Sequence, residues 1–323
     1  MIQKPFIRAS VNGNPVADIF YSALVSARIH DAPGQEADTV ELTFDDKDNL
    51  VAMPAKGAAL SVLFGNGAFG AQKMGRFIVE GTAIEGGDDG EFIVVSGRSA
   101  DMRKDIKEPL SEHFDDMTVG DIVRQLAGRH GYGAKVDPSI ASIKLPYLAR
   151  YEQGADDFLT RIADRFGALF AVKDGKFLML PHGLLPPVTI DKRECESWKF
   201  QIQPRPLYGK VEAGWFDRAK GEVQYEQHDT GMPGAARRLR RILPSQAEAK
   251  AAAQSEGNRL GRATGTGSIT LYGRPDIMAD APIVTTGFRA EANGLWRCAG
   301  VDHVYDDTYK TTVEVEAPEE GKT

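Results

Sequence analysis

The chain has 323 residues, which is enough for two or three domains of ordinary size. Hydrophobic residues make up 42% of it and charged residues 26%, a composition that is typical of globular proteins and excludes a disordered chain. The formal net charge of −7 argues against nucleic-acid binding as the main role and leaves binding to other proteins open.

The N-terminus lacks the apolar core of a signal peptide, because Pro5 and Arg8 interrupt it. No apolar run approaches the roughly 18–20 residues that a membrane span needs, so no membrane insertion is expected. Cys195 and Cys298 lie far apart in unlike contexts, which predicts two buried free thiols and neither a disulfide framework nor a zinc site. We therefore expect a protein that is made in a cytoplasm and stays reduced there.

Residues 1–100 predict a β-rich domain. The turn Asn12-Gly13-Asn14 suits a backbone with positive φ, and clusters of Gly, Pro, Asn and Asp separate the other strand candidates. Strands with this spacing are typical of a sandwich or a barrel. The candidates are residues 6–11, 16–21, 23–30, 39–44, 58–64, 74–84 and 91–97.

A helix is predicted to begin at Thr118. This residue is a suitable N-cap, and Asp121 stands three positions later in a capping-box arrangement. Apolar residues then recur at helical spacing on one face, and Gly131 suits the end of the helix.

Residues 154–168 predict a second amphipathic helix. Phe158, Leu159 and Ile162 lie in its apolar stripe, and Gly167 suits a left-handed end. The pair Asp174-Gly175 then separates two apolar runs, which predicts a tight hairpin. Two helices on a small sheet indicate an α+β domain that ends near residues 181–187.

The last third again predicts strands, with one helix among them. Ser245 and Glu248 form a full capping box that opens an alanine-rich helix to about residue 259. The strand candidates are residues 198–202, 208–216, 222–228, 238–243, 268–271, 283–288, 294–305 and 309–316.

These elements predict an α+β protein, mainly β, with two small β-barrel domains that flank an α+β middle domain. The first barrel is expected over residues 1–100 and the middle domain over residues 101–190. The second barrel, with one inserted helix, is expected over residues 191–323.

Three segments carry a resemblance to a known family. They are residues 34–46, residues 154–168, and a C-terminal run from Ser245 through Leu271-Tyr272-Gly273-Arg274-Pro275-Asp276 to Val315. In this order they resemble the phage late control D family of baseplate hub proteins and the N-terminal hub part of VgrG. The chain departs from the family pattern at Gly154, where Ser is usual, and at Asp156, where an aromatic residue is common.

The resemblance implies a structural hub at the tip of a contractile tail. It implies a homotrimer in which six barrels form a pseudo-sixfold ring that joins the tail tube to the central spike. The implied partners are a tail tube or tube-initiator protein, a trimeric spike protein, and other baseplate and tape-measure proteins. Because the chain stops soon after the second barrel, a separate spike protein is expected. The implied location is the virion tail baseplate, after assembly in the bacterial host cytoplasm.

No catalytic, cofactor-binding or metal-binding residue is predicted. Asp156-Asp157 could be read as a carboxylate pair for glycoside hydrolysis, but consecutive helical residues point about 100° apart. Acidic residues are also favoured at the start of a helix. Residues 45–48, Asp-Asp-Lys-Asp, lack the Gly and the closing Glu of a calcium loop.

The remaining motifs also favour structural roles. The six histidines form no metal-ligand pattern, and Asp302 and His303 would point to opposite faces of a strand. The glycines at 261, 265 and 267 follow a helix instead of preceding one, which argues against phosphate binding.

The run Arg237-Arg238-Leu239-Arg240-Arg241 is the one sharp charge feature. It stands without interleaved aromatic residues, so docking of an acidic partner or salt bridges within a trimer are favoured over nucleic acid. The alternative functions are a tail-associated peptidoglycan hydrolase, a hub of a tailocin or type VI-like injection particle, and a carbohydrate-binding module. Such a module needs clustered aromatic residues, whereas the three tryptophans, Trp198, Trp215 and Trp296, are widely separated.

Overall fold

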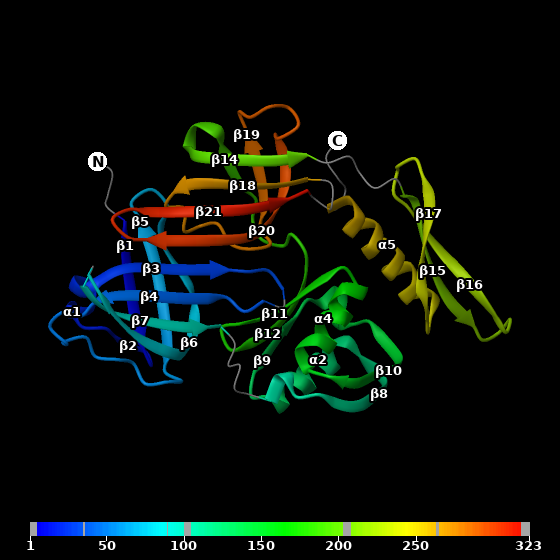
Figure 1. Ribbon diagram of the computed structural model, residues 1–323. Helices are drawn as coiled ribbons and strands as arrows, with labels where there is room; N and C mark the ends of the chain where they lie inside the picture. The colour runs from blue at the N-terminus through cyan, green and yellow to red at the C-terminus, as the bar shows by residue number, and fades with distance from the viewer. Residues whose placement is uncertain are drawn as a thin grey trace.

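Strands dominate the computed structural model, which describes residues 5–34, 36–88, 90–99, 105–202, 208–262 and 265–317 (Figure 1). Helices are few, so the predicted class, α+β and mainly β, is confirmed. None of the described helices is long and apolar enough to cross a membrane.

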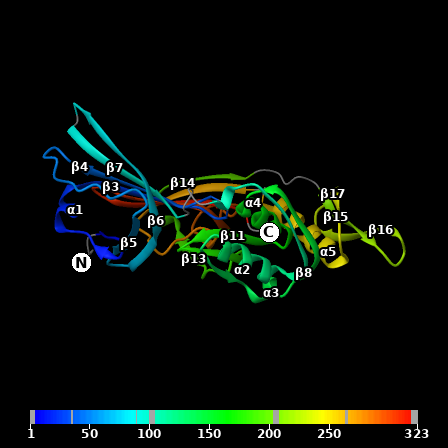
Figure 2. The ribbon, with the colours of Figure 1, turned by 90° about the horizontal axis from the view of Figure 1, so that it is seen from below.

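Strands of the first segment follow the predicted order, and their burial alternates as expected for strands with one face on a core. Figure 2 shows the β6–β7 hairpin standing out from the rest of this segment. The strands are β1 (Phe6–Val11), β2 (Asn14–Pro15), β3 (Leu24–Asp31), β4 (Thr39–Asp45), β5 (Ala59–Asn66), β6 (Gly70–Gly87) and β7 (Gly90–Arg98).

The strand expected over residues 16–21 is wrong. Strand β2 ends at Pro15, and helix α1 (Asp18–Ala23) follows it. Pro15 has no N–H to extend the ladder, and Asp18 lies in the first turn, where the helix dipole favours an acid. Phe20 packs on Phe44 with ring centroids 4.8 Å apart, which holds the helix on the sheet.

The two end segments share one sheet. Strand β20 pairs with β3 along Val301 to Tyr305, so the described residues form a 13-stranded sheet that includes strands of both ends. Its main path runs β14-β18-β21-β20-β3-β4-β7-β6-β5-β1-β2, which Figure 1 shows side by side. Closure of each end into a barrel and the three domain boundaries stay predictions. The C-terminal strands are β13 (Val188–Asp191), β14 (Cys195–Ile202), β18 (Gly265–Tyr272), β19 (Pro282–Thr286), β20 (Gly294–Tyr305) and β21 (Tyr309–Glu316), with the 3₁₀ turn η2 (Lys192–Glu194).

Both predicted helices of the middle segment are present. Helix α2 (Val119–Arg129) follows its N-cap Thr118, whose hydroxyl accepts the N–H of Asp121 at 3.1 Å. Helix α4 (Ala155–Arg165) buries its apolar stripe, and the chain then turns at Gly167 with φ of 63°. The predicted hairpin joins β11 (Ala168–Lys173) to β12 (Lys176–Pro181).

The middle segment also holds elements that the sequence did not predict. They are η1 (Asp105–Lys107), β8 (Leu110–Thr118), β9 (Gly133–Val136), α3 (Pro138–Ala141) and β10 (Lys144–Gln153). Strands β8 and β10 form a separate two-stranded ribbon, and most of their residues stay solvent-exposed. Because neither strand shows a clean alternation, the sequence carries no strong strand signal there.

A three-stranded arm projects from the C-terminal segment (Figure 1). It contains β15 (Tyr208–Asp217), β16 (Glu222–Asp229) and β17 (Ala235–Leu243) in the order β16-β15-β17. Helix α5 (Gln246–Arg262) covers one face. Ser245 caps it as predicted: its hydroxyl accepts the N–H of Glu248 at 3.4 Å and donates to the carboxylate of that residue at 3.1 Å. The arm has its own small buried cluster around Val211, Ala213 and Ala253.

Candidate functional site

Lys173 joins three parts of the chain through two buried carboxylates. It lies at the end of β11 and forms ion pairs with Asp31 of β3 and, at 3.0 Å, with Asp38 before β4. Asp31 also accepts the N–H of Ala279 from the C-terminal segment at 2.7 Å. One cluster therefore fastens the middle segment to both end segments.

The charges of this cluster depend on one another. Burial by itself would raise the pKa of Asp31, but Lys173 and the Ala279 amide hold that pKa below its usual value. Burial, together with the nearby Asp31 charge, raises the pKa of Asp38 to about 7. The two carboxylates hold the pKa of Lys173 above its ordinary value although burial opposes them. The cation is therefore what keeps two buried acids side by side.

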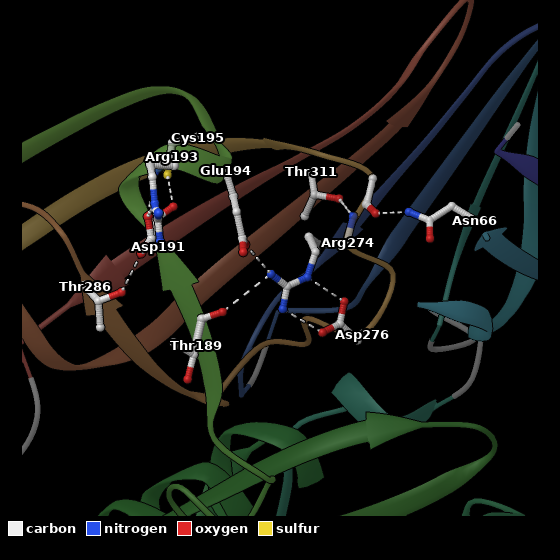
Figure 3. Close-up of polar contacts among 11 residues, drawn as sticks. Asn66, Thr189, Asp191, Arg193, Glu194, Cys195, Arg274, Asp276, Thr286 and Thr311 are labelled. Atoms are coloured by element: carbon white, nitrogen blue, oxygen red, sulfur yellow. Dashed lines mark hydrogen bonds and ion pairs between the residues drawn. The ribbon is translucent and has the colours of Figure 1, made fainter. Parts of the chain in front are cut away.

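Arg274 makes a second joint, which Figure 3 shows. Its Nε and Nη2 each donate to Asp276 at 2.9 Å, and its Nη1 donates to Glu194 at 3.1 Å. The guanidinium lies 4.3 Å from the ring centroid of Phe69 in the first segment. The preceding carbonyl, of Gly273, accepts a hydrogen bond from Asn66 of that same segment. The Gly-Arg-Pro-Asp motif of the sequence resemblance is thus a structural clamp between the two ends.

Arg165 makes the third joint. It forms an ion pair with Glu248, and the side chains of both residues are almost fully buried, with 6% and 4% of their surface exposed. Arg165 ends α4, and Glu248 lies in the first turn of α5, so the pair ties the arm to the middle segment. Ser255 adds a hydrogen bond from α5 to the carbonyl of Asp164.

Sequence reasoning did not single out any of these joints as sites. Lys173 borders a hairpin turn and Asp31 opens a turn cluster, and both positions are usually exposed. The available signal was weak: a lysine at the end of an otherwise apolar strand. Their partners lie far away in the sequence, so only the folded chain brings them together.

The acidic pair of α4 is divided between the interior and the surface. Asp156 is buried, with 9% of its surface exposed, whereas Asp157 is exposed. Asp156 borders a cavity of about 430 Å³ whose lining also includes His30, Arg98 and Lys107. The two carboxylates therefore do not face one another, as expected for consecutive helical residues.

The acidic residues after β4 form a turn. Asp45 accepts the N–H of Lys47 at 3.2 Å, and Asp46 accepts the N–H of Val51 at 2.9 Å. Within the described residues, no three His, Cys, Asp or Glu side chains are grouped so that they could hold a metal ion.

Asp302 and His303 point to opposite sides of β20, as predicted. Asp302 contacts His30 at 3.1 Å, whereas the buried His303 contacts Thr311 at 3.2 Å and Tyr309 at 3.0 Å through Nδ1. Full burial lowers the pKa of His303 to about 4. This histidine is therefore a neutral core residue whose hydrogen bonds join β20 to β21.

Replacement of His303 by Gln is expected to flatten the loss of stability in acid. A histidine with a folded pKa of about 4 and an unfolded pKa of 6.5 binds its proton more readily when unfolded. Its contribution is complete above pH 6.5 and is lost as the pH falls toward 4, by roughly 3 kcal/mol. Urea unfolding between pH 7 and 4.5 measures this difference. His113→Gln, at an exposed position, is the control, and equal pH profiles for the native chain and His303→Gln would contradict the assignment.

The arginine run lies on β17, and its first two members are paired within the chain. Arg237 forms an ion pair with Glu256 of α5 at 2.8 Å, and Arg238 forms one with Glu212 of β15 at 2.8 Å. Arg238 also lies 4.2 Å from the ring centroid of Tyr225. Arg240 and Arg241 are exposed.

The cysteines and glycines of the sequence analysis are only partly as expected. Both cysteines are free; Cys298 is buried, but Cys195 is only partly buried, because the edge strand β14 begins there. Burial raises the pKa of the Cys195 thiol to about 11. Gly265 and Gly267 lie in β18, where Gly267 is packed against Phe200, so they form no phosphate loop.

Among the described strands, the long sheet has open edges at β14 and along part of β6, besides those at β2 and β13. Strand β14 ends the described path on one side, and residues 79–87 of β6 pair only with β7 among the described strands. Both edges carry exposed apolar side chains: Ile84 is 72% exposed, Trp198 44% and Ile202 51%. Open edges of this kind are ready to pair with another chain.

The chain is similar in sequence to two curated proteins along nearly its whole length. It is 28% identical over 342 residues to the probable baseplate hub protein of Escherichia phage P2, with 91% of this chain and 88% of that protein covered. It is 26% identical over 357 residues to the probable baseplate hub protein of Escherichia phage 186, with 95% and 91% covered. No protein-family model matches the chain.

Solved structures share the fold at lower identity. The 43 kDa tail protein of prophage MuSo2 from Shewanella oneidensis matches with a TM-score of 0.71 and 14% identity, over 99% of this chain and all of that one. The E. coli c3393 protein, a component of the type VI secretion system, matches with a TM-score of 0.58 and 13% identity. That match covers 99% of this chain and 78% of that protein.

The chain therefore has the fold that this phage tail protein and this type VI secretion component share. The curated sequence relatives give more detail than the fold does. The chain is a relative of the phage baseplate hub proteins, and the resemblance predicted from its sequence is confirmed.

Proposed function

We propose that this chain is the structural hub of a contractile-tail baseplate, where three copies form a ring that joins the tail tube to the central spike. The observation that carries the proposal is similarity to baseplate hub proteins over nearly the full length of both chains. The location that follows is the tail baseplate of the virion. The proposed partners are the tube or tube-initiator protein, a trimeric spike protein, and other baseplate and tape-measure proteins.

The open edges at β14 and β6 support a ring. A head-to-tail contact places edge β14 of one copy against the β6 edge of the next, and repetition of one such contact closes a cyclic assembly. Closure would pair the unpaired backbone groups of both edges and cover Ile84, Trp198 and Ile202. Each chain would then supply an uninterrupted layer from β14 to β6 to the wall of the ring.

The three joints support a load-bearing role. Lys173 and Arg165 fasten the segments through buried or half-buried ion pairs at long sequence separation, and Arg274 adds its contact with Phe69 of the first segment. Such pairs are costly to break one partner at a time, so the segments hold a defined geometry. A tube-to-spike adaptor needs this rigidity because its two contact faces must keep a fixed spacing.

We propose that the chain has no enzymatic activity. The acid pair that would suit a glycosidase is divided between interior and surface. A second candidate is a hub in a type VI-like particle, which the likeness to the E. coli type VI component favours at the level of fold. That alternative changes the particle and leaves the hub role the same.

Edge variants test the ring. The chain is co-expressed with the candidate spike protein, and the native mass of the complex is measured by light scattering. The expected hub content is three copies of the 35.2 kDa chain. The substitution Ile84→Lys or Trp198→Lys is expected to abolish this trimer, because it would bury a charge at the contact between neighbouring copies.

Leu50→Lys is the matched control, because Leu50 is 64% exposed and lies outside both edges. It should leave the mass unchanged. The ring through these edges is rejected if both edge variants assemble as well as the control.

A further inference from the structure

The cavity of about 430 Å³ beside Asp156 is built by two parts of the chain. Residues of β3, β4 and β7 and of the turn before β4 form one part of its lining, and residues of η1, α4 and β11 form the other. The cavity therefore lies where the first segment meets the middle segment. Its volume falls in the range of roughly 300–1,000 Å³ that is common for ligand pockets.

Asp156 is the least exposed charged residue of this lining, with 9% of its surface exposed. Its Oδ1 atom is covered and accepts no hydrogen bond from the described residues, and Asp156 forms no ion pair with any of them. Buried polar atoms in proteins nearly always have a hydrogen-bond partner. An unpartnered carboxylate oxygen at a cavity therefore indicates a site that a ligand completes.

The start of α4 makes room for this carboxylate. A Cβ atom added at Gly154 would overlap with Oδ1 of Asp156, and it would lie 3.1 Å from the Cα atom of Lys107. The carboxylate thus occupies the space beside η1 that a glycine leaves free. Asp156 lies in the first turn of the helix, where the dipole favours a negative charge although no N–H donates to Oδ1.

The neighbouring cations do not neutralise Asp156. Arg98 forms an ion pair with Glu80 at 3.1 Å. Lys173, next to the lining residue of β11, is held by the two carboxylates of its own joint. Lys107 is exposed and forms no ion pair with the residues that the structure describes. The missing partner is therefore a cation, which a ligand would bring.

Apolar side chains line the cavity beside the carboxylate. Ile106 and Phe170 are each 2% exposed and belong to the core of the middle segment, and Val172 packs against that core. These side chains would cover an aliphatic stem while the charged end of the stem met Asp156. An anion would be repelled by the carboxylate, and a purely apolar ligand would leave Oδ1 without a donor.

We propose that this cavity binds an alkylammonium group, with Asp156 as the residue that receives the positive charge. An ammonium is a compact charge with three donors on a flexible aliphatic stem, which matches the carboxylate and the apolar wall. A lysine side chain of a partner protein and a free polyamine share this chemistry. The site does not depend on the proposed ring, because one chain supplies the whole lining.

Nα-acetyl-lysine N-methylamide tests the site by ligand-observed nuclear magnetic resonance with the full chain. We expect it to bind at least about tenfold more tightly than Nα-acetyl-norleucine N-methylamide, which has the same stem without the charge. Asp156→Asn should weaken binding of the lysine compound at least about tenfold. Asp157→Asn is the matched control: it removes the same charge at an exposed position of the same helical turn and should leave binding within about twofold.

Lys107→Met is a second variant, which keeps Asp156 and removes a cation from the lining. It should bind the lysine compound as tightly as the native chain or more tightly, because a charge that repels the ligand is lost. Weaker binding would show that Lys107 holds an anionic group there, and it would overturn the proposal. Tighter binding of Nα-acetyl-glutamate N-methylamide than of the lysine compound would overturn it in the same way.

The proposal is also overturned if the lysine compound does not bind the native chain or if the two aspartate variants weaken binding equally. Spermidine distinguishes the two sources of the ligand. Tighter binding of the lysine compound than of spermidine, lost in Asp156→Asn, supports a side chain of a partner protein. The reverse order, with the same dependence on Asp156, supports a free polyamine.

Discussion

Replacement of Lys173 by Met is expected to lower the free energy of unfolding by about 3–5 kcal/mol at neutral pH. The variant removes the cation that Asp31 and Asp38 share and leaves two buried carboxylates beside each other. Removal of one partner from a buried ion pair costs more free energy of unfolding than the intact pair contributes, because the remaining charge has no compensation. Urea unfolding, followed by circular dichroism, measures the change.

The loss in Lys173→Met should shrink as the pH falls. Without the cation, the pKa values of both carboxyl groups rise in the folded state, so the folded variant binds more protons than the unfolded chain. The free energy of unfolding of the variant therefore increases as the pH falls from 7 to about 5. Lys73→Met is the control, because Lys73 forms an exposed pair with Asp174 and should cost less than about 1 kcal/mol. Equal effects of the two variants would contradict the role of Lys173 as a joint.

Replacement of Arg165 by Met is expected to cost a similar 3–5 kcal/mol and to loosen the arm. It leaves Glu248 buried without its cation at the contact between α4 and α5. The double variant Arg165→Met/Glu248→Gln removes both charges, while the amide oxygen of Gln can still accept from Ser245. It should recover a large part of the loss, because no uncompensated charge remains.

The native chain, the single variants Arg165→Met and Glu248→Gln, and the double variant form a double-mutant cycle. The coupling energy between the two side chains is expected to exceed about 1 kcal/mol. Arg259→Met supplies the reference, since Arg259 is exposed and its partner Glu256 keeps a second cation, Arg237, so stability should change little. Proteolysis provides an independent readout: Arg165→Met should be cut in the arm faster than the native chain. Strictly additive single effects would mean that the pair does not join the two helices.

Local signals were the part of the fold that the sequence carried best. Thr118, Ser245 and Gly167 mark helix ends through hydrogen bonds or backbone conformations that depend on a few neighbouring residues. The Asp174-Gly175 turn is of the same kind, with φ of 51° and 72°. Each was predicted correctly because the physical cause lies within four residues of the element.

Long-range pairing could not be predicted. The β3–β20 pairing, which merges the two end segments into one sheet, joins His30 to Asp302. No pattern within either strand specifies this partner, since both simply alternate. The sequence therefore indicated two separate barrels and gave no sign of a shared sheet.

The joints were missed for the same reason. Asp31, Asp38 and Lys173 each have a local environment that suggests solvent, and only their convergence buries the two carboxylates and partly buries the lysine. Arg274 was noticed as part of a family motif, but its contacts with Phe69 and Glu194 follow from the fold. Buried charges at segment boundaries are thus a feature that sequence periodicity does not reveal.

Electron cryo-microscopy of the chain in complex with its spike protein tests the central claim most directly. We predict a ring of three copies with six similar lobes, lined by the strands from β14 to β6 of each chain, with the spike on the threefold axis. A particle with one hub chain, or a ring closed through surfaces other than β14 and β6, would contradict the account.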